Sequence, residues 1–410
     1  MHKESRYKWI KGGVSSPQGF AASGIRIGVK EHAAPDKKDM ALIFSEHPAV
    51  AAGVFTLNNV KAAPVILCQR HLERQKGMRA VIVNSGNANA CTGKRGLADA
   101  EKTAALTSKA LETSASSVLV CSTGTIGVPL PMDKIAGGIT LACKNLSRAG
   151  GADAARAIMT TDTCAKQVAV RFKIDGRDVL IGAVAKGAGM IAPNMATLLV
   201  FITTDAMVGR KALQSALAVA VDKSFNRVLV DGDQSTNDTV LCLANGAAGN
   251  FSLTERHPGW PVFRKALEEV CRRLAEMIIR DGEGVTKVIR LTVKGAIDDA
   301  DAEMAARAIA HSLLVKTSWF GADPNWGRVM CAVGYSGARI IPEKISIRYD
   351  NKPAVLRGRA SGLPPEQLHR IISKKEFSIE IDLRQGKGTY SMLTCDCSLE
   401  YVKINADYMT

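Results

Sequence analysis

The stretch KGAGMIAPNMATLLVFITTDA, residues 186–206, divides into two unlike halves. Its first half is built from glycines and other small residues, which permit unusual backbone conformations, and Pro193 fixes its own backbone angle. Its second half, residues 197–204, is mostly β-branched and aliphatic, which is the pattern of a buried strand. The sequence therefore predicts a glycine-rich loop that runs directly into a rigid strand at the bond between Ala196 and Thr197.

A peptide bond at such a junction is suited to self-cleavage. If the Thr197 hydroxyl attacks the Ala196 carbonyl, the peptide becomes an ester, and its hydrolysis leaves Thr197 as a new chain terminus. A terminal threonine combines a nucleophilic hydroxyl with an α-amine that accepts its proton. The alternative is an ordinary glycine-rich loop before a core strand, and composition alone favours this alternative.

Apolar patterns along the rest of the chain predict alternating strands and helices. Two predicted strands lead into loops of glycine and small polar residues, SGNANACTG (85–93) and CSTGTIG (121–127). These loops lack phosphate-binding patterns and are suited to present backbone N–H groups to a negatively charged oxygen. Strands are expected at 24–28, 40–44, 51–55, 79–84, 117–120, 287–294 and 329–334 and over most of the tail from 344, and helices at 97–114, 132–147, 152–161, 208–224, 260–280, 300–314 and 365–374.

Composition and charge restrict the class of protein. The 410 residues are 46% hydrophobic, enough for a large core, and the net charge of +15 is scattered without a basic run. A nucleic-acid-binding protein is therefore an alternative that no binding motif supports. The ten cysteines form no C-x-x-C pair, and two reduced thiols are the favoured interpretation of Cys395 and Cys397 over a metal site. Without a signal peptide or a membrane-spanning run, a cytoplasmic protein is expected.

The order of residues around the loop–strand junction resembles the ornithine acetyltransferase (glutamate N-acetyltransferase) family. Members of that family cut themselves between Ala and Thr in the motif K-G-x-G-M-I-x-P-x-M-A-T. The resemblance extends over nearly the whole chain through 83–93, 121–127, MTTDT (159–163), DGDQSTNDT (231–239), RDGEGVTK (280–287), GADPNWGR (321–328) and NADYMT (405–410). The fixed positions of the cleavage motif are all present, as Lys186, Gly187, Gly189, Met190, Ile191, Pro193, Met195, Ala196 and Thr197.

The resemblance implies roles for individual residues. Thr197 is the expected nucleophile, and the bond between Ala196 and Thr197 is the expected cleavage site. Thr123 and Gly124 match the family's oxyanion hole, whereas a tight strand-to-helix turn is the alternative. The residues that match the family's substrate-binding positions are Thr163, Lys186, Thr197, Glu283, Asn405 and Thr410, and the alternatives for these are solvated charges, a helix cap and a frayed tail.

The resemblance also implies a fold and an activity. The expected fold is α/β, a layered α/β/β/α-type sandwich with a smaller C-terminal α/β region. Cleavage gives an α chain (1–196) and a β chain (197–410), which are expected to form an α2β2 heterotetramer.

The expected reaction belongs to arginine biosynthesis. It moves an acetyl group from N2-acetylornithine to glutamate through acetyl-Thr197, giving ornithine and N-acetylglutamate. It needs no metal or other cofactor. Some relatives also use acetyl-CoA as a donor, and the residues leave this open here. A self-processing aminopeptidase or amidase of related fold is the alternative enzyme.

Overall fold

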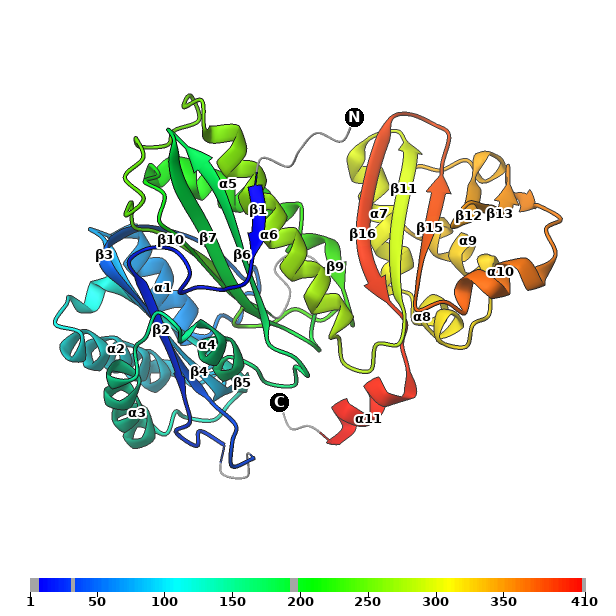
Figure 1. Ribbon diagram of the computed structural model, residues 1–410. Coiled ribbons are helices and arrows are strands. Elements are labelled where there is room, and N and C mark those ends of the chain that lie inside the picture. Colours follow the sequence, from blue (N-terminus) through cyan, green and yellow to red (C-terminus); the bar gives the residue numbers. More distant parts are fainter. Residues whose placement is uncertain (1–6, 31–33, 192–197, 408–410) are drawn as a thin grey trace.

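Two sheet-based regions make up the structure, which is a computed structural model that describes residues 7–30, 34–191 and 198–407. Figure 1 shows a larger region, coloured blue to green, beside a smaller region coloured yellow to red. The long helix α6 (Trp260–Arg280) packs on the larger region and precedes β11 (Val288–Ala296), a strand of the smaller one. The two halves of the sequence that meet at residues 196 and 197 are therefore not the two regions of the fold.

The larger region is built on a mixed sheet, with nine strands in the described part of the chain. The strand order is β1-β6-β7-β8-β10-β3-β4-β5, and β2 pairs with β3. The pairs β8–β10 and β4–β5 are parallel, and the others are antiparallel. The strands are β1 Tyr7–Ile10, β2 Phe20–Ile25, β3 Met40–Phe55, β4 Met78–Asn87, β5 Val118–Thr125, β6 Lys166–Ile174, β7 Arg177–Lys186, β8 Leu199–Thr204 and β10 Thr239–Ala244.

Strand β3 folds this sheet into two stacked layers. Its pairing with β4 shifts register between Phe44 and Ala49, and an irregularity of this kind bends a strand. The first part of β3 pairs with β2 and β4, and the last part pairs with β10. Both layers therefore belong to one continuous hydrogen-bonded sheet.

Alternating side chains identify what each layer faces. On β8, Phe201 lies in a core shared with β4, whereas Ile202 packs in the core beneath α5 and α6. On β4, Val81 lies in the shared core, whereas Ile82 packs against α1, α2 and α3. The order of layers is therefore α/β/β/α, and the predicted fold class is confirmed. The helices of this region are α1 Ala63–Glu73, α2 Gly93–Ala110, α3 Met132–Lys144, α4 Gly151–Ala157, α5 Arg210–Asp222 and α6.

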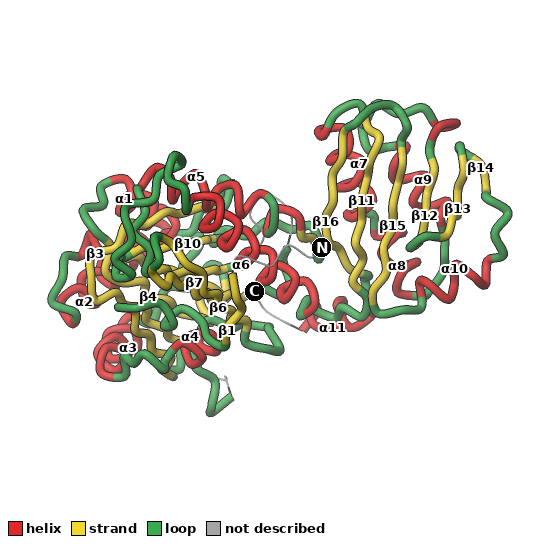
Figure 2. The backbone as a smooth tube through the Cα atoms, turned by 45° about the horizontal axis from the view of Figure 1, so that its top comes forward, coloured by secondary structure: helices red, strands yellow, loops and turns green. Residues whose placement is uncertain are grey.

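The smaller region is a second sheet covered by helices. Its seven strands, counted in the described residues, follow the order β14-β13-β12-β15-β11-β16-β9, and Figure 2 shows most of them side by side. The strands are β9 Val228–Leu229, β11 Val288–Ala296, β12 Ser346–Tyr349, β13 Lys352–Leu356, β14 Arg359–Ala360, β15 Glu376–Asp382 and β16 Gly388–Cys395. The helices of the smaller region are α7 Asp299–His311, α8 Leu313–Phe320, α9 Trp326–Gly334 and α10 Pro365–Ile372. Along the described chain, three-residue 3-10 turns occur at Ala115–Ser117 in the larger region and at Phe225–Arg227 and Pro342–Lys344.

The last described helix, α11 (Leu399–Asp407), leaves the smaller sheet and reaches the larger region. The Tyr401 hydroxyl donates to Asp231 at 3.2 Å, and Asn405 Nδ2 donates to Glu283 at 2.9 Å. These bonds hold α11 against the segments that follow β9 and α6.

The structure corrects some of the predicted elements. Residues 329–334 lie in helix α9 and not in a strand, because Val329, Ala332 and Val333 are buried at helical spacing and Asn325 caps the helix start. The short strands predicted at 40–44 and 51–55 are parts of the single strand β3. Lys186 is the last residue of strand β7 and does not begin a loop.

The hairpin of β6 and β7 and the helix α11 were not predicted from the sequence. The strand predicted at 197–204 is present as β8 from Leu199. Within the described ranges, every helix is either too short or too polar to cross a bilayer.

Candidate active site

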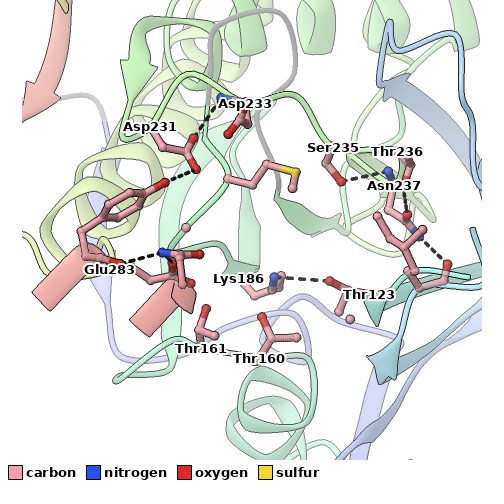
Figure 3. Close-up of a pocket in the computed structure, with 17 residues that line it drawn as sticks. Thr123, Thr160, Thr161, Lys186, Asp231, Asp233, Ser235, Thr236, Asn237 and Glu283 are labelled. Atoms are coloured by element: carbon pink, nitrogen blue, oxygen red, sulfur yellow. Dashed lines mark hydrogen bonds between the residues drawn. The ribbon is translucent and has the colours of Figure 1, made fainter. Parts of the chain in front are cut away.

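A cavity of about 330 Å³ lies where several strands and loops of the larger region end (Figure 3). Thr123 and Gly124 come from the end of β5, and Lys186 comes from the end of β7. Most lining residues are polar, so the cavity is suited to a small polar molecule. The other lining residues are Ala88, Ile126, Thr160, Thr161, Gly189, Met190, Asp231, Asp233, Ser235, Thr236, Asn237, Glu283, Tyr401 and Asn405.

Gly124 occupies a position that only glycine fits. Its φ is +131°, and a Cβ there would lie 2.3 Å from the Gly86 carbonyl carbon and 2.5 Å from the Asn87 nitrogen. These are backbone atoms of β4, paired with the end of β5. The absence of a side chain lets β4 and β5 approach each other here, and it fixes the backbone beside Thr123.

Lys186 is buried and lies against Thr123. Its Nζ donates to Thr123 Oγ1 at 3.3 Å, and the side chain is only 3% exposed. Burial lowers the pKa of Lys186, while the nearby carboxylates of Asp162, Asp238 and Glu283 act in the opposite direction. The cavity therefore has a cationic group directly beside a hydroxyl at the end of a strand.

A buried charge network fixes the segment behind Lys186. Asp162 accepts from Lys166 Nζ at 2.7 Å and from the Gly187 nitrogen at 2.8 Å, and Lys166 also binds Asp281. Burial opposes ionisation of Asp162, but Lys186, Lys166 and these hydrogen bonds lower its pKa to about 2. Burial likewise acts against the charge of Lys166, and the two carboxylates raise its pKa. The network stays charged and holds the end of β7 in place.

Thr163 lies outside the lining of the cavity. Its backbone nitrogen and hydroxyl both donate to Asp281. The neighbouring residues Thr160 and Thr161 line the cavity instead. Thr163 therefore contacts the charge network behind the site.

Carboxyl groups form the wall opposite Lys186. Glu283 accepts from Asn405 and lies so close to Gly189 that a Cβ there would be 2.5 Å from its oxygens. Asp231 accepts from Tyr401 and from the Ile191 nitrogen. The predicted residues Glu283 and Asn405 are thus brought together with Lys186, Thr123 and Gly124 in one cavity.

The loop between β9 and β10 contributes residues that sequence reasoning did not assign. Asn237 is buried, and its Nδ2 donates to the Ala88 oxygen at 2.6 Å and to the Ser122 oxygen at 2.8 Å. It ties this loop to the ends of β4 and β5. The motif DGDQSTNDT contains both Asn237 and Asp231, so the signal was present, but nothing in it indicates which side chains point inward. Asp162 likewise lies inside the motif MTTDT (159–163), whereas Tyr401 lies outside the matching motifs.

The proposed cleavage residues Ala196 and Thr197 and the terminal Thr410 lie outside the described residues. The first described residue after them is Leu198, whose nitrogen donates to the buried carboxyl of Asp238 at 2.9 Å. Burial raises the pKa of Asp238, which the bond from Leu198 and the charge of Lys186 partly offset.

No three His, Cys, Asp or Glu side chains gather into a metal site within the described ranges. Cys395 is buried at the end of β16, where Lys316 Nζ approaches its sulfur at 3.5 Å. Cys397 lies beyond the end of that strand and is half-buried. These two cysteines therefore do not share one face of a strand.

The four-layered fold and the polar cavity at its strand ends define an enzyme of the α/β class that acts on small polar molecules. The chain belongs to the ArgJ family, whose sequence profile matches residues 21–410.

Curated relatives align with the chain from end to end. A protein of Symbiobacterium thermophilum, named arginine biosynthesis bifunctional protein ArgJ, is 48% identical over 403 residues, which are 98% of this chain and 100% of the relative. A protein of Geobacter sulfurreducens with the same name is 49% identical over 396 residues, 96% of this chain and 99% of the relative.

Two solved structures are also similar. ArgJ of Bacillus halodurans is 43% identical with a TM-score of 0.49, and the match covers 51% of this chain and 98% of that chain. Ornithine acetyltransferase of Mycobacterium tuberculosis, complexed with ornithine, is 42% identical with a TM-score of 0.42, covering 47% of this chain and 99% of that chain.

Proposed function

We propose that this protein is an acetyltransferase of arginine biosynthesis that moves the acetyl group of N2-acetylornithine to glutamate. The observation that carries the proposal is the family match over residues 21–410, together with the name of the end-to-end relatives. The comparisons favour this activity over the aminopeptidase or amidase alternative. The +15 charge alone suggested nucleic-acid binding, and the names of the two relatives above do not support it.

The proposed reaction has two half-reactions at one nucleophile. The Thr197 hydroxyl attacks the acetyl carbonyl and passes its proton to the α-amine of the same residue. That proton goes to the departing nitrogen, so ornithine leaves and acetyl-Thr197 remains. The α-amine of glutamate then attacks the ester, N-acetylglutamate leaves, and the Thr197 hydroxyl is restored. Each tetrahedral intermediate carries a negative oxygen, for which donors at Thr123 and Gly124 are the proposed oxyanion hole.

Self-cleavage between Ala196 and Thr197 generates the nucleophile, with an α chain of 1–196 and a β chain of 197–410. The strand pairing next to this bond supports a fold that persists after the chain is cut. Leu199 pairs with Lys186 on one side and with Thr239 on the other. Leu199 therefore stays paired in the sheet when the bond between Ala196 and Thr197 is broken. Because the chains interlock in one sheet, we propose that they remain associated after cleavage. The proposed assembly is an α2β2 heterotetramer.

Lys186 is the proposed partner of the substrate α-carboxylate, because it lies beside Thr123 and carries the basic side chain among the described lining residues. Glu283 and Asn405 form the other proposed substrate contacts. Thr163 contributes through Asp281, which its hydroxyl contacts. A direct role for Thr410 remains part of the proposal.

The reaction requires no metal or redox cofactor, since the nucleophile, base and oxyanion donors are protein groups. Dialysis against a chelator should leave activity unchanged. The ten free cysteines agree with the proposed reducing cytoplasm. Because the relatives are named bifunctional, acetyl-CoA is a proposed second acetyl donor for glutamate.

A donor–acceptor assay tests the proposal. Purified protein is incubated with N2-acetylornithine, with and without glutamate, and ornithine and N-acetylglutamate are both measured. Equal amounts of the two products, dependent on glutamate, are expected. Ornithine release that is unaffected by glutamate and yields acetate would identify a hydrolase instead. Replacing acetylornithine with acetyl-CoA tests the second donor.

A further inference from the structure

The proposed function sends two unlike amino acids to one cavity, and the inference here rests on that function. Acetylornithine ends in an ammonium group, whereas glutamate ends in a carboxylate. A wall of fixed charge that attracts one of these groups repels the other. A cavity that serves both half-reactions therefore needs a group that changes its charge with the substrate.

Side chains of opposite charge line opposite sides of the cavity. Lys186 and Thr123 lie on one side, and Asp231 and Glu283 lie on the other, as Figure 3 shows. An amino acid whose α-carboxylate is held by Lys186 extends its side chain toward Asp231 and Glu283. The end of the substrate side chain thus meets carboxyl groups, which suits ornithine and does not suit ionised glutamate.

Hydrogen bonds leave one oxygen of Asp231 able to hold a proton. Oδ1 accepts from the Ile191 nitrogen at 2.9 Å and from the Asp233 nitrogen at 3.0 Å. Two N–H donors fix this oxygen as an acceptor. Oδ2 accepts only from the Tyr401 hydroxyl, at 3.2 Å, among the described residues, which leaves its second lone-pair site for a proton. Oδ2 can therefore carry a proton while the two hydrogen bonds that Oδ1 accepts remain intact.

The groups around Asp231 favour a carboxyl that titrates near neutral pH. Burial raises its pKa to about 6, the charge of Asp233 acts in the same direction, and the two N–H donors and Tyr401 oppose the rise. Glu283, from the segment after α6, adds negative charge on the same wall. Cys395, at the end of β16, also lies close enough to Asp231 to interact with its charge. Burial raises the pKa of the Cys395 thiol to about 11, so this thiol is neutral.

Two basic side chains lie near the loop that carries Asp231, and His311 Nδ1 is close to Gly232. Lys316 of α8 binds the Cys395 backbone oxygen. Burial lowers the pKa of His311 at the end of α7, where the charge of Asp233 acts against that change. Neither Lys316 nor His311 forms a hydrogen bond to Asp231 among the described residues, so Asp231 can respond to the substrate.

We propose that Asp231 determines the dual specificity of the cavity: as a carboxylate it binds the side-chain ammonium of ornithine, and with a proton on Oδ2 it donates a hydrogen bond to the side-chain carboxylate of glutamate. The proton comes from solvent when glutamate binds and returns to solvent when the acetylated product leaves. No bond other than this O–H bond forms or breaks at Asp231.

Proton uptake during binding tests the proposal directly. The wild-type cleaved protein is titrated by calorimetry with ornithine, glutamate and norvaline in buffers of different ionisation enthalpy, and each series gives the protons bound per ligand. Free amino acids carry no acetyl group, so no transfer occurs. Norvaline has the same α-groups without a charged side chain and is the matched reference. With a pKa of about 6, Asp231 is about one quarter protonated at a pH of about 6.5.

The expected result is that glutamate binding takes up about one proton more than ornithine binding, with norvaline between them. Asp231→Asn keeps an oxygen for the two N–H groups and cannot ionise. This variant should lose the difference between glutamate and ornithine, and its dissociation constant for ornithine should rise about 10- to 100-fold through loss of a charged partner. Asp233→Asn, at the exposed neighbour, should retain most of the proton difference.

Equal proton uptake for ornithine and glutamate in the wild type would overturn the proposal, whether or not the variant folds. A difference that persists in Asp231→Asn and disappears in Glu283→Gln would also overturn it. If the wild type transfers acetyl groups but shows no proton difference, this inference alone fails. If it binds neither amino acid and transfers nothing, the proposed function fails as well.

Discussion

Replacing Gly124 with alanine should reduce catalysis strongly, because the new Cβ would meet backbone atoms. It would lie 2.3 Å from the Gly86 carbonyl carbon, and ordinary contact begins at 3.4 Å, so the strands must separate by about 1 Å. A displacement of about 1 Å in a catalytic group can cost about 100-fold in rate. We expect kcat for acetyl transfer to fall about 100-fold with little change in KM, since the lost donor acts in the transition state.

The assay is rapid-quench measurement of ornithine release in a single turnover, on protein verified as two chains. Gly127→Ala is the matched control. Gly127 also has a positive φ, +82°, but a Cβ there would meet nothing within 4 Å. It should cost about 1 kcal/mol of stability and leave the rate nearly unchanged. A Gly124→Ala rate within threefold of wild type would refute the proposed role of this strand end.

Thr123→Ala should lower kcat with little change in KM, and a rise in KM alone would make Thr123 a binding residue. Lys186→Met, if still self-cleaved, should weaken ornithine release and N-acetylglutamate formation together, measured as separate half-reactions; loss of only the glutamate half would contradict a shared carboxylate site. The pKa of Asp162 is lowered in the folded protein from 3.8 to about 2, so its contribution is present above pH 3.8 and is lost as the pH falls through about 2. Free energies of unfolding from urea titrations should show that the wild type loses about 2 kcal/mol over this pH window through Asp162, whereas Asp162→Asn lacks this loss. Equal dependence of the unfolding free energy on pH in the two proteins would contradict the assignment.

Helix and strand patterns with strong periodicity could be predicted from the sequence. The stripe of α6, with Leu267, Val270 and Leu274 buried, follows from apolar spacing alone. The run 329–334 could not be assigned from its sequence, because five apolar residues followed by a glycine fit a buried strand as well as a helix. The hairpin of β6 and β7 has an Asp175–Gly176 turn with positive φ at both residues, a signal that was present and went unused.

The site itself depends on contacts that no local pattern contains. Thr123 and Lys186 are 63 residues apart, and β5 and β7 bring them to 3.3 Å. Tyr401 and Asp231 are 170 residues apart and meet because α11 crosses between the two regions. The resemblance supplied Thr123, Lys186, Glu283 and Asn405, whereas the partners that hold them required the folded chain.

Self-cleavage between Ala196 and Thr197 is the central claim, since it creates the proposed nucleophile. Intact mass spectrometry of the purified protein, with N-terminal sequencing of the second chain, measures it most directly. We predict two chains, the second beginning Thr-Leu-Leu-Val, and a single uncut chain for Thr197→Ala. A wild-type protein that transfers acetyl groups while remaining one chain, or whose second chain begins at another residue, would contradict the account.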